Sequence, residues 1–171
     1  AAHPVPAYGF PQATQAVRLD PGSFTAREVF DEFCVFDSTV QVPSFQGGVL
    51  PFATEGGAWV FDASGAPVQQ RVETSRVVVT VPRVAMPAGG YPTVVMIRTG
   101  AGGDRASVDR GIRNASGEVL IPGTGPAREF ARAGFASVMI DGVHGGIRNI
   151  AGGDEQFAVF NLLNAEALRD N

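Results

Sequence analysis

The chain has 171 residues, 44% of them hydrophobic, and a net charge of −4. It contains no lysine, so arginine carries all of its strongly basic charge. The acidic balance, with no basic stripe, RNA-binding aromatic motif or Cys/His finger, argues against a nucleic-acid partner. No apolar run approaches the roughly 18 residues that a transmembrane helix needs, so we expect no membrane span.

The use of arginine in place of lysine, with frequent alanine, glycine and valine, is typical of a GC-rich bacterial genome. The Ala1-Ala2-His3-Pro4 start is typical of a mature terminus left after signal removal, so we expect a secreted or periplasmic protein. The single cysteine, Cys34, excludes an intrachain disulfide. Its apolar surroundings predict a buried, unreactive thiol, and a bridge to a second chain stays open.

The first half of the chain indicates an arm followed by β structure. Residues 1–25 hold four prolines without periodicity, which predicts an extended N-terminal arm. Within residues 26–82, segment 32–40 is strand-like and segment 75–82 predicts a further strand. Between them, residues 58–72 predict a hairpin, because an Asp-Ala-Ser-Gly turn separates two β-rich runs.

The second half contains the pattern of a strand–helix–strand unit. Residues 91–97 and 134–140 are apolar runs rich in β-branched residues, which predicts parallel strands buried on both faces. Between them, residues 124–134 carry the usual helix signals, with Pro126 at the first helical position and Gly134 just past the end. We therefore predict an α/β fold.

Both predicted strands run into glycine-rich loops, where open α/β sheets collect their chemistry. The loop 100–103 is not a P-loop, because it lacks the Gly-Lys-Ser/Thr ending, and it lacks the third glycine of a dinucleotide-binding fingerprint. Three interpretations stay open: an oxyanion loop, a structural turn and a loop that holds a ligand phosphate. Asp154-Glu155 shows no calcium-loop alternation, so we predict no metal site and no cofactor.

These two loops, at residues 99–103 and 141–148, resemble the N-terminal half of an α/β-hydrolase of the secreted bacterial esterase and lipase kind. The resemblance implies that residues 26–171 form the first half of such a domain, the N-terminal part of an α/β-hydrolase sheet with a β-rich N-terminal extension. It implies that main-chain N–H groups contribute to an oxyanion hole, at Thr99, Gly100, Ala101 and Gly102. It assigns loop support to Asp141, His144 and Arg148. Thr99 stands where many members carry histidine.

The chain contains no Gly-x-Ser-x-Gly sequence, so we expect none of its eight serines to be the nucleophile. The resemblance places the catalytic serine, acid and histidine downstream. We therefore expect the C-terminal part of the same hydrolase, as a second chain or a further segment, to complete the sheet and the site. The implied function is a serine carboxylesterase or lipase that cleaves a small ester by acyl transfer.

Two alternatives stay open. A peptidase of the prolyl-oligopeptidase type would share the same loops, and a non-catalytic binding module would keep the fold without the chemistry. An Asp141–Arg148 charge pair that braces the second loop is expected in each case.

Overall fold

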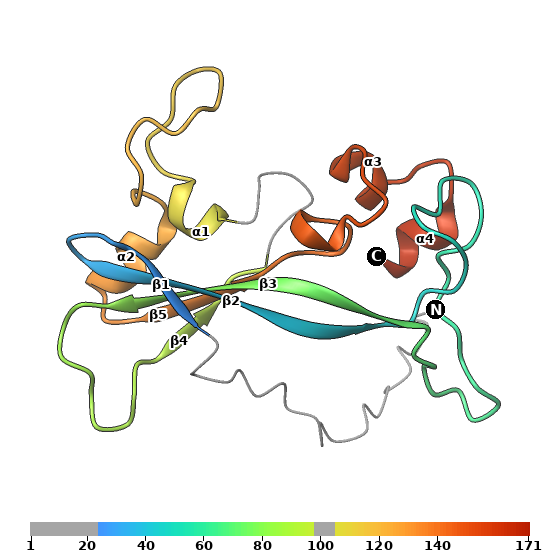
Figure 1. The fold of residues 1–171 in the computed structure, drawn as a ribbon, viewed down its shortest axis with the longest axis horizontal. Coiled ribbons are helices and arrows are strands. Elements are labelled where there is room, and N and C mark those ends of the chain that lie inside the picture. Colours follow the sequence, from blue (N-terminus) through green and yellow to red (C-terminus); the bar gives the residue numbers. More distant parts are fainter. Residues whose placement is uncertain (1–23, 98–104) are drawn as a thin grey trace, which may run out of the picture.

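The computed structural model describes residues 24–97 and 105–171, which form one five-stranded sheet in the order β1-β2-β3-β5-β4 (Figure 1). The strands are β1 (Thr25–Val29), β2 (Phe33–Ser44), β3 (Arg71–Pro82), β4 (Thr93–Val95) and β5 (Ala136–Ile140). The helices are α1 (Ala106–Asp109), α2 (Pro126–Arg132), the 3-10 turn η2 (Gly146–Arg148), α3 (Glu155–Val159) and α4 (Ala165–Asp170). In the described residues, no helix is both long and apolar enough to span a membrane.

The predicted fold class is wrong. The sheet is mixed and the described structure is mostly β, because three of the four strand pairings are antiparallel and only β4 pairs with β5 in parallel. The described α-helices have four to seven residues, too short to form the layers of an α/β fold. The structure is therefore not the N-terminal part of an α/β-hydrolase sheet. The one parallel pair among the described strands lies at an edge of a sheet that long antiparallel strands dominate.

The β2–β3 pair forms the frame of the molecule. Each strand has twelve residues, and they pair without interruption from Phe33 with Pro82 to Ser44 with Arg71. This confirms both predicted strands and lengthens them. The predicted hairpin at residues 58–72 is reduced to isolated bridges, among them Phe61 with Pro67. Its turn is held by the Asp62 carboxylate, which accepts hydrogen bonds from the backbone.

The strand–helix–strand unit itself is present as predicted. Helix α2 begins after Gly125 with Pro126 in its first turn, and Gly134 just past its end has φ +81°. A positive φ is cheap only for glycine, so this residue turns the chain from α2 into β5. Strand β5 then pairs in parallel with β4, from Thr93 opposite Ala136 to Val95 opposite Val138.

The hydrophobic core lies between the sheet and the first two helices. It joins β2 and β3 to α1 and α2 through fully buried side chains, namely Phe33, Val35, Val78, Val108, Ala127 and Ala131. Cys34 is a free thiol that is half-buried rather than fully buried as expected. The N-terminal arm predicted for residues 1–25 lies almost entirely outside the described residues.

The two edges of the sheet differ. Strand β4 was predicted to be buried on both faces, but it is an edge strand whose Val95 side chain is 70% exposed. No charge or proline interrupts Thr93–Val95. The opposite edge, β1, carries an Arg27–Asp37 ion pair and an irregular register, which are devices that discourage edge pairing.

The edge of β4 is therefore expected to drive self-association. A Val95→Lys variant should reduce concentration-dependent aggregation several-fold, because a charge on an edge strand opposes pairing with another strand. Light scattering against protein concentration measures this. Val84→Lys, which changes net charge equally at an exposed bend, is the control. Equal protection by both variants would mean that net charge, not the edge, sets association.

Candidate functional site

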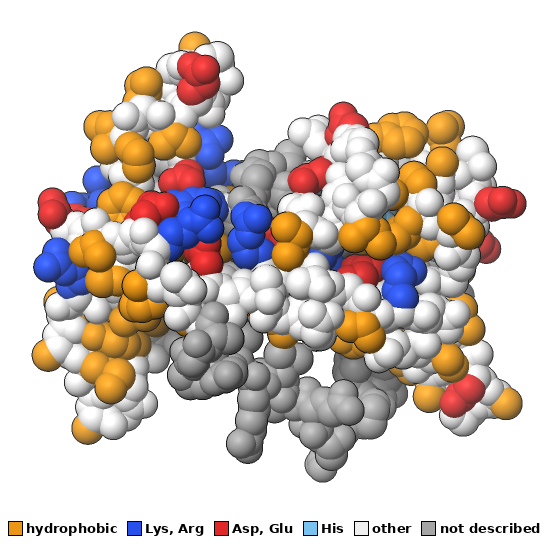
Figure 2. Space-filling view, in the orientation of Figure 1, with side chains coloured by type: hydrophobic (Ala, Val, Ile, Leu, Met, Phe, Trp, Pro, Cys, Tyr) orange, Lys and Arg blue, Asp and Glu red, His pale blue; other side chains and the backbone are white. Residues whose placement is uncertain are grey.

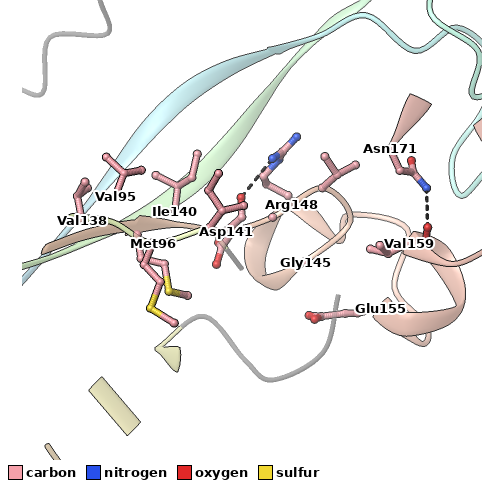
Figure 3. A pocket seen from close by; sticks show the side chains of 14 residues that line it. Val95, Met96, Val138, Ile140, Asp141, Gly145, Arg148, Glu155, Val159 and Asn171 are labelled. Atoms are coloured by element: carbon pink, nitrogen blue, oxygen red, sulfur yellow. Dashed lines mark hydrogen bonds between the residues drawn. The ribbon is translucent and has the colours of Figure 1, made fainter. Parts of the chain in front are cut away.

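A pocket of about 490 Å³ opens where β4 and β5 end (Figure 3). Its lining is mainly apolar and comes from both strands, the loop after β5 and α3, including Val95, Met96, Val138, Ile140, Val143 and Val159. Four side chains add polar groups at one end: Asp141, Arg148, Glu155 and Asn171. The pocket thus joins the carboxyl ends of a parallel strand pair to the segment that follows β5.

Asp141 is the first residue after β5, and its side chain is buried, with 1% exposure. Its Oδ2 accepts hydrogen bonds from the backbone N–H groups of Arg76, at 3.1 Å, and Ile147, at 3.2 Å. Its Oδ1 is buried and has no hydrogen-bond partner among the described residues. Gly146 lies against this carboxylate with φ +55°, so a side chain there would collide with Asp141. The carboxylate therefore ties β3 to the loop after β5.

The expected Asp141–Arg148 side-chain pair is wrong. Arg148 donates instead to Glu73 of β3, with 2.9 Å between Nε and Oε2, and it reaches only the backbone oxygen of Asp141, at 3.2 Å. The second oxygen of Glu73 accepts from Arg71, at 2.8 Å. The Asp141 carboxylate accepts from backbone N–H groups instead, whereas Glu73 offers Arg148 a buried carboxylate that forms a charge-assisted hydrogen bond.

The two arginines favour the ionised form of the Glu73 carboxyl group. Burial alone would raise the pKa of its carboxyl group, but the hydrogen bond and charge of Arg148, followed by those of Arg71, outweigh burial and lower the pKa below its ordinary value. Glu73 therefore stays ionised at neutral pH. Arg71 also donates to the backbone oxygen of Gln46 and lies over the ring of Phe52, 5.3 Å from its centre.

His144 and Phe52 are strained residues in contact with each other. They have φ +54° and +59°, in the left-handed region that favours glycine, and their rings meet edge to face with centres 5.9 Å apart. The His144 Nε2 atom lies 3.0 Å from Oδ1 of Asn171. Such strain persists only where neighbouring groups hold it in place.

Two asparagines hold the Phe52 side of this contact. The side-chain amides of Asn161 and Asn164 both donate to the backbone oxygen of Phe52, at 2.8 and 2.9 Å. Asn164 also donates to the backbone oxygen of Gly56, at 3.0 Å. These bonds join two stretches of chain more than 100 residues apart in sequence, which we call the 45–59 loop and the 158–171 segment.

The structure brings three of the predicted site residues together. Asp141, His144 and Arg148 lie in one loop beside the pocket, although His144 does not line it. The predicted oxyanion residues fall outside the described residues, and that assignment stays a prediction: Thr99, Gly100, Ala101 and Gly102. In the described part of the chain, no cluster of three His, Cys, Asp or Glu side chains is arranged to hold a metal ion.

Sequence reasoning missed Glu73 and the asparagines. A carboxylate at the centre of a β-rich run, in Arg-Val-Glu-Thr-Ser-Arg at residues 71–76, was a usable signal, because a buried strand rarely carries an acidic residue without a partner. The asparagines have no comparable local signal, since their amides bind backbone groups distant in sequence.

Comparison with known proteins found no relative of this chain. The chain matches no protein-family model, and neither the curated proteins nor the solved structures contain a significant match to it. Function is therefore argued from the geometry of the site.

Gly146→Ala tests the contact with Asp141. We expect it to lower the free energy of unfolding by about 1–3 kcal/mol more than Gly65→Ala, because it displaces a buried carboxylate from its hydrogen bonds. Gly65 also has positive φ, but no atom of the described residues lies within 4 Å of a Cβ built there, so Gly65→Ala isolates the backbone cost. Urea unfolding measures both variants, and equal losses would contradict the contact.

Arg148→Ala tests the pairing with Glu73. The free energy of unfolding should fall by about 1–3 kcal/mol, because a buried carboxylate loses a charge-assisted donor. Arg132→Ala removes an exposed pair with Glu32 and should cost at most about 1 kcal/mol. Chemical denaturation of the two variants compares these costs. A similar small loss in both would show that Arg148 contributes little.

Proposed function

We propose that this chain forms the acyl-binding side of a serine ester hydrolase, of carboxylesterase or lipase type. The observation that carries the proposal is the apolar pocket at the carboxyl ends of β4 and β5 (Figure 3). Its volume of about 490 Å³ falls within the range of small-molecule sites, and its lining suits an acyl chain rather than a charged ligand.

The place in the sequence of two residues that line the pocket supports the same proposal. Met96 and Ile97 line it, and the glycine-rich segment 99–102 begins two residues after Ile97 in the sequence. In the proposed reaction, a serine from outside these 171 residues attacks the ester carbonyl. A main-chain N–H of segment 99–102, most directly that of Ala101, stabilises the negative oxygen of the tetrahedral intermediate. Asp141, His144 and Arg148 support the loop beside the pocket and do not react.

The described residues contain no nucleophile paired with a histidine base, and this favours a second candidate, a binding module without catalysis. Its hydrogen-bond partner among the described residues is Asn171, and no described serine hydroxyl is bound to it. A triad histidine must hold a serine within hydrogen-bond reach. In this alternative the pocket binds an apolar small molecule and releases it unchanged.

Filling the pocket tests the proposal. We expect Met96→Trp, in the complete natural protein with any polypeptide that copurifies, to lower kcat/KM for nitrophenyl hexanoate by about tenfold or more, because the indole occupies the space of the acyl chain. The loss for nitrophenyl acetate should be smaller. Met86→Trp is a matched control, since Met86 is 66% exposed and lies outside the pocket.

A fluorophosphonate label identifies the nucleophile in the same preparation. The label is expected on a serine outside the 171 residues. Three results together would contradict the hydrolase and favour the binding module. The protein would take up no label, it would turn over no ester, and it would bind a fluorescent fatty acid in a way that Met96→Trp abolishes. Cleavage of peptide anilides in preference to esters would contradict the ester substrate.

A further inference from the structure

One wall of the pocket belongs to a single helical turn. Strands β4 and β5 form one side of the pocket, and Glu155 and Val159 of α3 form part of the other (Figure 3). Helix α3 has five residues, and a helix of that length is not stable by itself. Its apolar side chains give it little anchorage, because Phe157 is 52% exposed and only Ala158 is buried. The position of this wall therefore depends on hydrogen bonds.

Asn171 supplies the hydrogen bonds at the end of α3. The last carbonyl groups of a helix have no partner within the helix itself. The side-chain amide of Asn171 donates to two of them, the backbone oxygens of Ala158 and Val159, at 3.1 and 3.0 Å (Figure 3). The backbone N–H of Asn171 donates to the oxygen of Ala167 and closes the last turn of α4. One residue thus joins the ends of two helices.

The orientation of the Asn171 amide is fixed by its partners. Carbonyl oxygens only accept, so the Nδ2 group must face α3 and Oδ1 must face away from it. There Oδ1 accepts from Gln46 Nε2, at 2.9 Å, and from His144 Nε2, at 3.0 Å. Both hydrogens and both lone pairs of the amide are therefore used. Its partners come from α3, from the 45–59 loop and from the loop after β5.

The residue before Asn171 is held independently of α3. Trp59 donates from its indole Nε1 to the backbone oxygen of Asp170, at 3.0 Å, and from its backbone N–H to the Asp170 carboxylate, at 2.7 Å. The other end of α3 is tied to the loop after β5, where Glu155 Oε1 accepts from the backbone N–H of Gly146, at 2.8 Å. Asn171 is thus a fixed point to which the free end of α3 is bound.

From this geometry we propose that Asn171 is a positioning residue that sets the width of the pocket and, with it, the length of acyl chain that the site accepts. The inference rests on the ester hydrolase proposed above. Asn171 acts through Val159, which lines the pocket beside it. While both ends of α3 are held, the pocket keeps its volume of about 490 Å³. Release of the end at Val159 lets the wall move outward, so that a longer chain enters.

Asn171→Asp in the complete natural protein, with any polypeptide that copurifies, tests this role. The ionised carboxylate has the size of the amide and still accepts from Gln46 and His144, but it cannot donate to α3. We expect the ratio of kcat/KM for nitrophenyl decanoate to that for nitrophenyl hexanoate to rise about tenfold, the scale on which a pocket discriminates chain length. A loss of folded protein lowers both values equally and leaves their ratio unchanged.

Asn161→Asp is the matched control. The Asn161 amide also donates to two backbone oxygens, those of Phe52 and Ala53, but Asn161 does not line the pocket. This variant should destabilise the fold and keep the ratio within about twofold of the wild-type value. If Asn171→Asp does not fold, Gln46→Met decides the proposal. It keeps the length of the side chain, removes the donor to Asn171 Oδ1 and should raise the ratio in the same direction.

Binding separates this role from the hydrolase itself. Displacement of a fluorescent fatty acid by hexanamide and by decanamide compares chain lengths without turnover. If no ester is hydrolysed but Asn171→Asp raises the affinity for decanamide relative to hexanamide, the positioning role stands and the hydrolase fails. Ester turnover with an unchanged ratio in Asn171→Asp, or with the same rise in Asn161→Asp, overturns the positioning role and leaves the hydrolase. A protein that neither hydrolyses these esters nor binds these amides overturns both.

Discussion

The buried carboxylate of Glu73 is the constraint on which the site depends. It sits between Arg71 on its own strand and Arg148 on η2, and its exposure is 6%. Removing one partner from a buried charge costs several kcal/mol. Separation of the loop after β5 from β3 would take Arg148 away from Glu73 and leave Arg71 as its guanidinium partner. The pair with Arg148 therefore holds the loop that carries Asp141 and His144 against β3.

The two ends of the sheet are stabilised in different ways. Around α1 and α2 the contacts are apolar, between fully buried side chains of the core cluster. Around η2, α3 and α4 they are mostly polar, with asparagine amides and arginines bound to backbone and carboxylate groups. Exposed apolar side chains gather on the surface of this second end, at Phe157, Phe160, Leu162 and Leu163 (Figure 2). Hydrogen bonds and ion pairs depend strongly on the direction of the groups that form them. This end of the sheet can therefore hold residues in strained backbone conformations that an apolar core would not support.

Short-range signals in the sequence determined the ends of α2, the turn at Asp62 and the parallel approach of β4 to β5, because glycine, proline and aspartate restrict the backbone within a few residues. They also placed Asp141, His144 and Arg148 in one loop. The tertiary structure decided that β4 is an edge, that antiparallel strands dominate the sheet and that Arg148 binds Glu73, 75 residues away, rather than Asp141. Nothing local distinguishes these partners, since the choice depends on backbone N–H groups that the fold directs at Asp141 and on the side chain of Glu73 that it places beside the guanidinium.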